Sequence, residues 1–473
     1  MISPVWLKRH PNIAFCSDKS FFLKDFSHAA FNFPLLDPVK SIMMPAMALS
    51  TKPYKGTRDF YPEDMKLQKW MFQKLRSASE SFGYQEYDGP MLESFDLYAA
   101  KTGDEIVENQ LYWFLDRGER KVAMRPEMTP TMARMVAGQL NELPKPIRWY
   151  SLPNLWRYER PKRGRLREHW QLNVDLLGGN DKLADFEILQ VAYNIIKSFG
   201  GEDKIKVQIN NRRLINYFFQ EILKLNASSA LKASKAIDAR AKIGEEKYLT
   251  WMQEIGVTEA HQKQIEEFFT SDFDTIKNLY PCQGTEELEN LFESLKPLNK
   301  NNAFVYDPKI MRGLDYYTGT VFEVYDTSPE NNRSMFGGGR YDNLIGLFGK
   351  SKLSGIGFGM GDVTLRNFLE NHKLIPELPY NVDAFVTLLD YKYHDRVLEI
   401  SESLRSKNLK VSTALTTDKL AQQMKQANKL GAHFAIILGA DEFNSNKISL
   451  KNLKTGEQKT LSLDDTLAEI KNC

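Results

Sequence analysis

The sequence has little cysteine, no long apolar run and almost no net charge. Its only cysteines are Cys16, Cys282 and Cys473, and their wide separation matches no metal-ligand spacing, which indicates a reducing compartment without structural zinc. No uninterrupted apolar run reaches the ~18 residues that a membrane helix requires, so we expect no membrane segment. The net charge of +2 gives no general attraction for nucleic acid. Any site for a polyanion must therefore be local.

Length and composition predict a folded protein of several domains. A chain of 473 residues is too long for one ordinary core, and 42% hydrophobic with 26% charged residues is typical of a soluble globular protein. Residues 1–50 are rich in Phe, broken by prolines and without a helical or strand period. They make a poor transit peptide, so we interpret them as a flexible extension or an over-called start upstream of Met47. Organellar targeting by residues 1–46 stays the alternative.

The next stretch predicts an amphipathic helix followed by a strand. Pro62 suits a first helical position, apolar residues recur at helical spacing as far as Phe82, and Gly83 provides the stop. We expect the strand after this helix to contain Pro90, which predicts a free edge or a special partner. A further strand, a proline turn and a helix capped by Thr129 come next.

The densest run of charge is "WRYERPKRGRLREHWQ", residues 156–171. Its six cations are Arg157, Arg160, Lys162, Arg163, Arg165 and Arg167. Both flanks are strand-like, and Pro161 and Gly164 favour a turn between them. We expect an antiparallel hairpin with Arg157 on one strand and Gln171 and Asp175 on the other. Arginines held on a strand can bind phosphate oxygens in a planar, bidentate way. A solvated hairpin with internal Arg–Glu pairs is the alternative.

Two stretches rich in glycine and aromatic residues count against that alternative. Residues 311–326, "MRGLDYYTGTVFEVYD", join Arg312 to an aromatic strand, and residues 335–361 hold three consecutive glycines followed by alternating ones. Such glycines mark backbone that another group approaches closely. The spacing fits neither a P-loop nor the G-x-G-x-x-G dinucleotide motif. We therefore expect any ATP site to lie on an antiparallel sheet.

Six motifs occur in the order seen in the histidyl-tRNA synthetases, a family of class II aminoacyl-tRNA synthetases. They are "KGTRDFYPE", "RPEMT", "WRYERPKRGRLRE", "RGLDYYTG", "GGGRYD" and "GIGFGMG". The resemblance implies an α+β catalytic domain at 51–375, built on a mainly antiparallel sheet with flanking helices (the class II synthetase fold). It implies a helical insertion at about 211–300. Residues 382–473 alternate short strands with helices and resemble the anticodon-binding domain, an α/β domain with a small mixed sheet.

The resemblance also implies an activity, its substrates and an assembly. The activity is ATP-dependent activation of L-histidine to histidyl-adenylate and transfer to the 3′ end of histidine tRNA. Mg²⁺ would be held mainly through the ATP phosphates, and the enzyme would be a cytoplasmic homodimer. A non-catalytic regulatory paralogue from histidine biosynthesis is the alternative. The C-terminal domain and the arginine of "RGLDYY" favour the ligase.

By position in the motifs, the resemblance assigns roles to individual residues. Arg157 and Arg312 would be the catalytic cations on either side of the α-phosphate. The residues implied for ATP binding are Arg157, Glu159 near the adenine, Arg165 at the terminal phosphate, His169 and Arg312. The residues implied for histidine binding are Glu127, Thr129 and Gln171 at the α-amino end, and Asp175, Tyr317 and Tyr341 around the imidazole. The rest of the basic loop would meet the acceptor end of tRNA.

The chain departs from the family pattern at three places. Thr364 stands where the third class II motif carries an arginine for the γ-phosphate, and Arg366, two residues on, faces another side of the expected helix. His169 stands where an aromatic residue stacks on adenine, with Trp170 beside it. Asp175 is one methylene shorter than the usual Glu.

Two further predictions concern partners. The apolar stripe of the helix that begins at Pro62 and the strand with Pro90 are expected to form a two-fold interface. In the C-terminal domain, the helices carry Lys419, Lys425 and Lys429, which the resemblance assigns to tRNA.

Overall fold

The computed structural model describes residues 49–99, 109–179, 181–299, 301–311, 317–331, 333–349 and 352–472. The predicted extension falls almost wholly on residues 1–48, which lie outside the described residues, and so does Arg312. Within the described chain, no helix has the length and apolar character needed to cross a bilayer.

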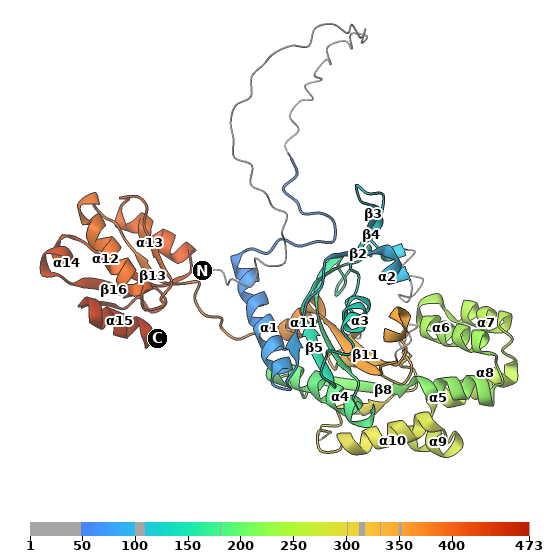
Figure 1. Cartoon of the computed structure of the whole chain (residues 1–473). Helices are drawn as coiled ribbons and strands as arrows, with labels where there is room; N and C mark the ends of the chain where they lie inside the picture. The colour runs from blue at the N-terminus through green and yellow to red at the C-terminus, as the bar shows by residue number, and fades with distance from the viewer. Residues whose placement is uncertain are drawn as a thin grey trace, which may run out of the picture. The chain divides into compact units, whose positions relative to one another are not determined.

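A large, mainly antiparallel sheet organises the region between residues 51 and 375, as predicted (Figure 1). Among the described strands of this sheet, β1–β5 and β8–β9 pair in parallel, and the other pairs are antiparallel. Across the sheet the strands are β1 (Gln85–Glu86), β5 (Ile147–Ser151), β7 (Glu168–Leu177), β12 (Gly355–Gly361), β11 (Ser334–Tyr341), β10 (Thr320–Asp326), β8 (Ile205–Asn211) and β9 (Phe304–Tyr306), and β6 (Asn154–Trp156) also pairs with β7.

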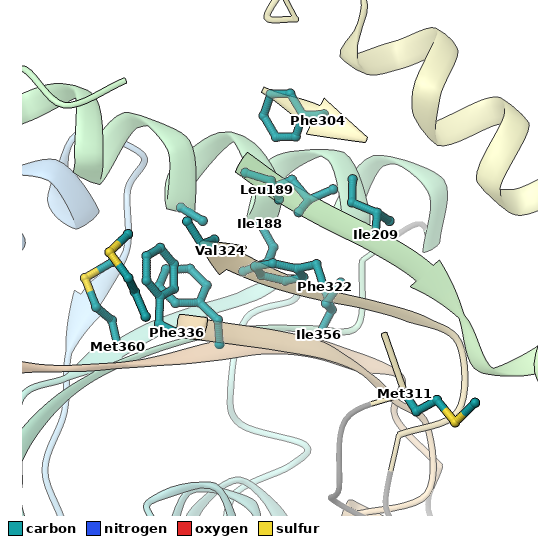
Figure 2. Packing of buried hydrophobic residues seen from close by; sticks show 14 of the residues in the cluster. Ile188, Leu189, Ile209, Phe304, Met311, Phe322, Val324, Phe336, Ile356 and Met360 are labelled. Atoms are coloured by element: carbon teal, nitrogen blue, oxygen red, sulfur yellow. The ribbon is translucent and has the colours of Figure 1, made fainter. Parts of the chain in front are cut away.

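Helices cover one face of this sheet through a continuous apolar core. They are α1 (Pro62–Glu80), α4 (Asp181–Ser198) and α11 (Asp362–Asn371). Figure 2 shows Phe322 and Ile356 of the sheet packed beside Ile188 and Leu189 of α4. Because side chains alternate along a strand, the intervening residues of these strands face the opposite side, where the candidate site lies.

The first helix and the strand after it differ from the prediction in two respects. Helix α1 begins at Pro62 as expected, but its stripe is already buried in the core: Met71 is 2% exposed and Leu75 is 1% exposed. The stripe is therefore not a free surface, and the two-fold interface stays a prediction. Pro90 belongs to no strand, because it lies between β1 and β2 (Leu92–Ser94), where the chain leaves the large sheet.

A second, three-stranded sheet precedes the basic run. It consists of β2, β4 (Lys121–Met124) and β3 (Trp113–Leu115), and it is accompanied by α2 (Phe95–Ala99) and α3 (Thr129–Gly138). The prediction that Thr129 caps α3 is wrong, because Thr129 is the first residue of the helix. The cap position is Met128, and no side chain makes a capping hydrogen bond there. The following Pro130 has no N–H, so the helix start has one fewer donor for a cap to satisfy.

The predicted helical insertion follows β8. Its elements are α5 (Arg212–Tyr217), a π-helical turn η3 (Phe218–Ile222), α6 (Ala227–Ile243), α7 (Glu245–Glu254), α8 (Glu259–Thr270), α9 (Phe273–Leu279) and α10 (Gln283–Leu295). Phe218 and Phe268 stack with their ring centroids 4.1 Å apart, and both belong to the same apolar core as the sheet. The insertion is thus joined to the sheet by packing.

The C-terminal region has its own sheet and its own core, as predicted. The sheet is mixed, since β13, β14 and β15 are parallel while β16 and β17 are antiparallel. Its elements are β13 (Val382–Val386), η5 (Tyr391–Tyr393), α12 (His394–Arg405), β14 (Val411–Thr413), α13 (Leu420–Lys429), β15 (Ala432–Ile437), α14 (Ala440–Ser445), β16 (Ile448–Asn452), β17 (Gln458–Leu461) and α15 (Leu463–Lys471). Lys419, Lys425 and Lys429 are exposed on or next to α13.

Candidate active site

A cleft of about 1160 Å³ opens over the face of the large sheet opposite α4. Ten predicted site residues lie in the described chain, and all ten line this cleft. They are Glu127, Thr129, Arg157, Glu159, Arg165, His169, Gln171, Asp175, Tyr317 and Tyr341. Residues that lie up to about 200 positions apart in sequence thus meet at one site. Arg312 is outside the described residues, so its predicted role stays a prediction.

The glycine-rich strands β11 and β12 form the floor of the cleft. Gly357 pairs with Asp175, and Gly359 pairs with Asn173, across the β12–β7 ladder. A Cβ at Gly357 would overlap the Asp175 carboxylate, and one at Gly359 would overlap the Gln171 amide. The sequence predicted that another group approaches these glycines. The groups that approach them in the fold are side chains of β7, which cross the strand to reach the cleft.

The Asp175 carboxyl is strongly perturbed by its surroundings. It is 3% exposed; one oxygen accepts a hydrogen bond of 2.5 Å from the Tyr341 hydroxyl, and Oδ2 has no hydrogen-bond partner among the described residues. Burial raises the pKa of Asp175 to about 7, which the bond from Tyr341 partly opposes. A buried oxygen without a partner is costly, so it favours a ligand that donates an N–H there.

Two polar residues of the cleft were missed by the sequence reasoning. Asn173 lies between Gln171 and Asp175 on the same face of β7, and its Oδ1 accepts a hydrogen bond of 2.7 Å from Gln171. The two-residue period of the strand could have found it. Glu323 of β10 also lines the cleft, aligned with Asn173 across Gly337 and Gly359. Only the strand order reveals that alignment.

The β6–β7 hairpin has the predicted antiparallel pairing, with His169 on β7 and Arg157 directly after the end of β6. The Nε of Arg157 donates to the carbonyl of Pro126 at 2.8 Å, which fixes the guanidinium beside the "RPEMT" segment. Burial, followed by the charges of Arg157 and Arg58, lowers the pKa of His169 to about 3. Its imidazole is therefore neutral near pH 7 and can stack on an aromatic ring.

Trp170 faces away from the cleft. Its ring packs edge-on against Phe60 at 5.2 Å, and its backbone N–H donates to Asp362 at 3.0 Å. The strand alternation thus separates the two neighbours, and His169 alone of the pair lines the cleft.

The cations of the loop between β6 and β7 have different partners. Arg165 lies 3.5 Å from the carboxylate of Glu159, so part of the predicted internal Arg–Glu pairing exists. Arg167 packs over the ring of Tyr158 at 4.0 Å and donates to the hydroxyl of Tyr54 at 2.7 Å. Arg167 therefore fixes the loop through its contacts with Tyr158 and Tyr54. Lys162, Arg163 and Arg165 line the cleft.

The departure at Thr364 has a local explanation. The Thr364 hydroxyl bonds to the carbonyl oxygens of Met335 and Gly361 at 2.8 and 3.0 Å, which ties α11 to β11. Arg366 donates to Glu370 at 2.8 Å and to Asp64 of α1 at 3.3 Å. It does not line the cleft. Arg366 therefore lies on another side of α11 than Thr364, as the helical spacing predicted. That it does not replace the motif arginine stays a prediction.

Comparison with known proteins identifies the family of the chain. Residues 56–363 match the family model "Histidyl-tRNA synthetase", and residues 383–473 match "Anticodon binding domain". The chain belongs to the histidyl-tRNA synthetase family. It is 44% identical to a histidine–tRNA ligase of Leptospira biflexa, over 90% of this chain and 99% of the relative. It is 35% identical to that of Thermoplasma volcanium, over 87% of this chain and 96% of the relative.

A solved structure agrees at the level of the whole fold. The histidyl-tRNA synthetase from Nostoc superposes with a TM-score of 0.76 at 26% identity, covering 90% of this chain and 99% of the other. The predicted class II fold and the family are therefore confirmed. The roles of individual site residues stay predictions.

Proposed function

We propose that this chain is a histidine–tRNA ligase, which activates L-histidine with ATP and transfers it to the 3′ end of histidine tRNA. The observation that carries the proposal is the buried Asp175 carboxyl, whose Oδ2 has no partner in the described part of the chain, in the same cleft as the Arg157 guanidinium. The first group can recognise a ring N–H, and the second can hold a phosphoryl oxygen. An amino acid with a nitrogen-bearing ring and a phosphate ester would thus lie next to each other.

In the proposed pocket, the imidazole of histidine donates one ring N–H to Asp175. A hydroxyl of Tyr341 or Tyr317 serves the other ring nitrogen as donor or acceptor, and the α-amino group lies toward Glu127, Thr129 and Gln171. A site built on such bonds rejects side chains without ring nitrogens, because the buried carboxylate would then lose its partner.

In the proposed reaction, the histidine carboxylate attacks the α-phosphorus of ATP and pyrophosphate leaves. Negative charge builds on the phosphoryl oxygens, where Arg157 is held in advance by the carbonyl of Pro126. A charge positioned before the reaction stabilises the transition state without reorganisation. Arg312 is proposed as the second cation, Arg165 as the contact to the terminal phosphate, and the neutral His169 as the stacking partner of adenine beside Glu159.

Magnesium is proposed to arrive with ATP, held mainly through the phosphates. The described residues contain no group of three His, Cys, Asp or Glu side chains that could hold a metal ion by themselves. Glu323, which lines the cleft and accepts a hydrogen bond of 2.6 Å from the Tyr325 hydroxyl, could supply one oxygen ligand. When bound, the ion would neutralise charge on the outer phosphates.

The remaining features of the proposal concern organisation and partners. We propose a catalytic domain at 51–375 with its insertion at about 211–300, and an anticodon-binding domain at 382–473. Family-model matches over residues 56–363 and 383–473 support the proposal of two domains. A homodimer in the cytoplasm is proposed from the family alone. Light scattering at assay concentration tests the dimer, and a fully active monomer would contradict it.

Histidine-dependent exchange of pyrophosphate into ATP, measured without tRNA, tests the function. Exchange should require L-histidine and should not occur with phenylalanine or glutamine. Histidine binding without exchange would favour the regulatory paralogue instead. Charging of histidine tRNA by the full chain then tests the second step.

A further inference from the structure

Asp342, the last residue of the "GGGRYD" motif, joins segments that are far apart in the sequence. Its Oδ2 accepts a hydrogen bond of 2.7 Å from the Thr318 hydroxyl and lies 3.1 Å from Nη2 of Arg213. Its Oδ1 accepts a hydrogen bond of 2.6 Å from the Ser354 hydroxyl. Both oxygens of one carboxylate thus hold three different segments together.

The Arg213 partner belongs to the first helix of the insertion, α5. Its guanidinium also binds Glu287 of α10, with Nη1 2.6 and 2.7 Å from the two carboxylate oxygens. Glu287 accepts a further bond of 2.8 Å from the amide of Asn211, whose Oδ1 caps α5. The insertion is therefore attached to Asp342 through elements near its beginning and its end.

Thr318, the second partner of Asp342, adjoins the proposed histidine pocket. Thr318 also donates its backbone N–H to the carbonyl of Arg340 at 2.7 Å, so two bonds fix it to the end of β11. Its neighbour Tyr317 is 8% exposed and lines the cleft, as does Tyr341, the neighbour of Asp342. A Cβ at Gly319 would press on the side chains of Arg340 and Arg213, which shows how closely this corner is packed.

We infer that Asp342 is a positioning residue for the histidine pocket, which it couples to the helical insertion. The inference rests on the proposed function, since it names what orients Tyr317 and Tyr341 toward histidine. Asp342, Thr318 and Arg213 do not line the cleft themselves, so they act through the two tyrosines. Bonds to an ionised carboxylate are stronger and more directional than neutral ones, which suits a group that must hold a geometry. The competing role is plain stabilisation of the fold.

A matched pair of substitutions at Thr318 separates the two roles. Thr318→Val keeps the shape of the side chain and removes its donor, whereas Thr318→Ser keeps the donor. We expect Thr318→Val to raise the histidine KM in pyrophosphate exchange about tenfold, the effect of one lost bond to a charged group, with the ATP KM unchanged. Thr318→Ser should restore the histidine KM.

Two further variants test the coupling and its specificity. Arg213→Met breaks the contact between the insertion and Asp342, and it should raise the histidine KM. Arg240→Met removes another ion-pair centre of the insertion, bonded to Glu245 and Glu266 at 2.8 and 2.9 Å, and should change neither KM. Asp342→Asn should behave like Thr318→Val. If Asp342→Asn fails to fold, the two Thr318 variants still distinguish positioning of the pocket from plain stabilisation of the fold.

The inference is overturned if Thr318→Val lowers only the melting temperature, or if both KM values rise together. It is also overturned if Thr318→Ser behaves like Thr318→Val. A wild-type protein without histidine-dependent exchange would instead contradict the proposed function. Histidine binding by calorimetry in the Thr318 pair would then test the positioning by itself.

Discussion

The Tyr341 hydroxyl reaches Asp175 at 2.5 Å across an intervening strand. The two residues lie on β11 and β7, and β12 runs between them. A Cβ at Gly355 would meet the Tyr341 ring, and one at Gly357 would meet the Asp175 carboxylate. The glycines of β12 therefore make this contact possible, and they turn a flat sheet face into a pocket.

Asp175→Asn should raise the histidine KM strongly and the ATP KM little. The carboxylate has one oxygen free for a ring N–H, whereas an amide can turn its donor toward the ligand instead. The loss expected for a mismatched buried partner is about 1–3 kcal/mol, or roughly five- to 150-fold in KM. Tyr317→Phe should act in the same direction more mildly. Steady-state exchange kinetics with each substrate varied checks this, and equal rises in both constants would place the imidazole elsewhere.

The same substitution should change how stability depends on pH. Burial raises the pKa of Asp175 from its ordinary 3.8 to about 7. Between these values the folded chain holds a proton that the unfolded chain has released. The free energy of unfolding therefore falls as pH rises through this window, by at most about 1.4 kcal/mol per pH unit from this group.

Urea unfolding of the ligand-free wild type and Asp175→Asn, at several pH values from 4 to 8, measures this effect. The variant should gain stability relative to the wild type as pH rises toward 7, and the difference should level off above it. A constant difference would show that the carboxyl titrates alike in the folded and unfolded chains.

Arg157→Ala should abolish adenylate formation far more than it weakens histidine binding. The guanidinium acts where charge develops, and the loss of one such contact costs about 3 kcal/mol or more in barrier, or roughly 150-fold or more in rate. Exchange rates together with histidine binding by calorimetry check this. Arg160→Ala is the matched control, because Arg160 is exposed and does not line the cleft. Near-normal exchange in Arg157→Ala would remove that residue from the mechanism. The same loss is predicted for Arg312→Ala.

Arg366→Ala should leave the ATP KM unchanged. Its guanidinium is bound to Glu370 and Asp64, so its loss should cost only about 0.2–1 kcal/mol of stability. Arg165→Ala, which alters a cation that lines the cleft, should raise the ATP KM. The two variants are compared in exchange assays with ATP varied. A raised ATP KM in Arg366→Ala would mean that α11 moves when ATP binds.

The family motifs named ten residues that line the cleft, and their roles stay predictions. Local rules also located helix α1 from Pro62 and the β6–β7 hairpin from its turn residues, because both depend on contacts between near neighbours. They failed at Pro90, which lies where the chain leaves the large sheet, and at Thr129, where Pro130 leaves the helix start with one fewer donor for a cap to satisfy.

The sequence by itself determined which groups are present: the cations of the loop, the carboxyl of Asp175 and the glycines of β11 and β12. Only the tertiary structure decided their protonation states and their contact partners. Burial gives Asp175 a pKa near 7 and His169 one near 3. The strand order aligns Glu323 with Asn173, and the packing of the insertion brings Arg213 to Asp342. Tyr341 and Asp175 lie 166 positions apart in the chain, and Arg213 and Asp342 lie 129 apart, so no local pattern records these contacts.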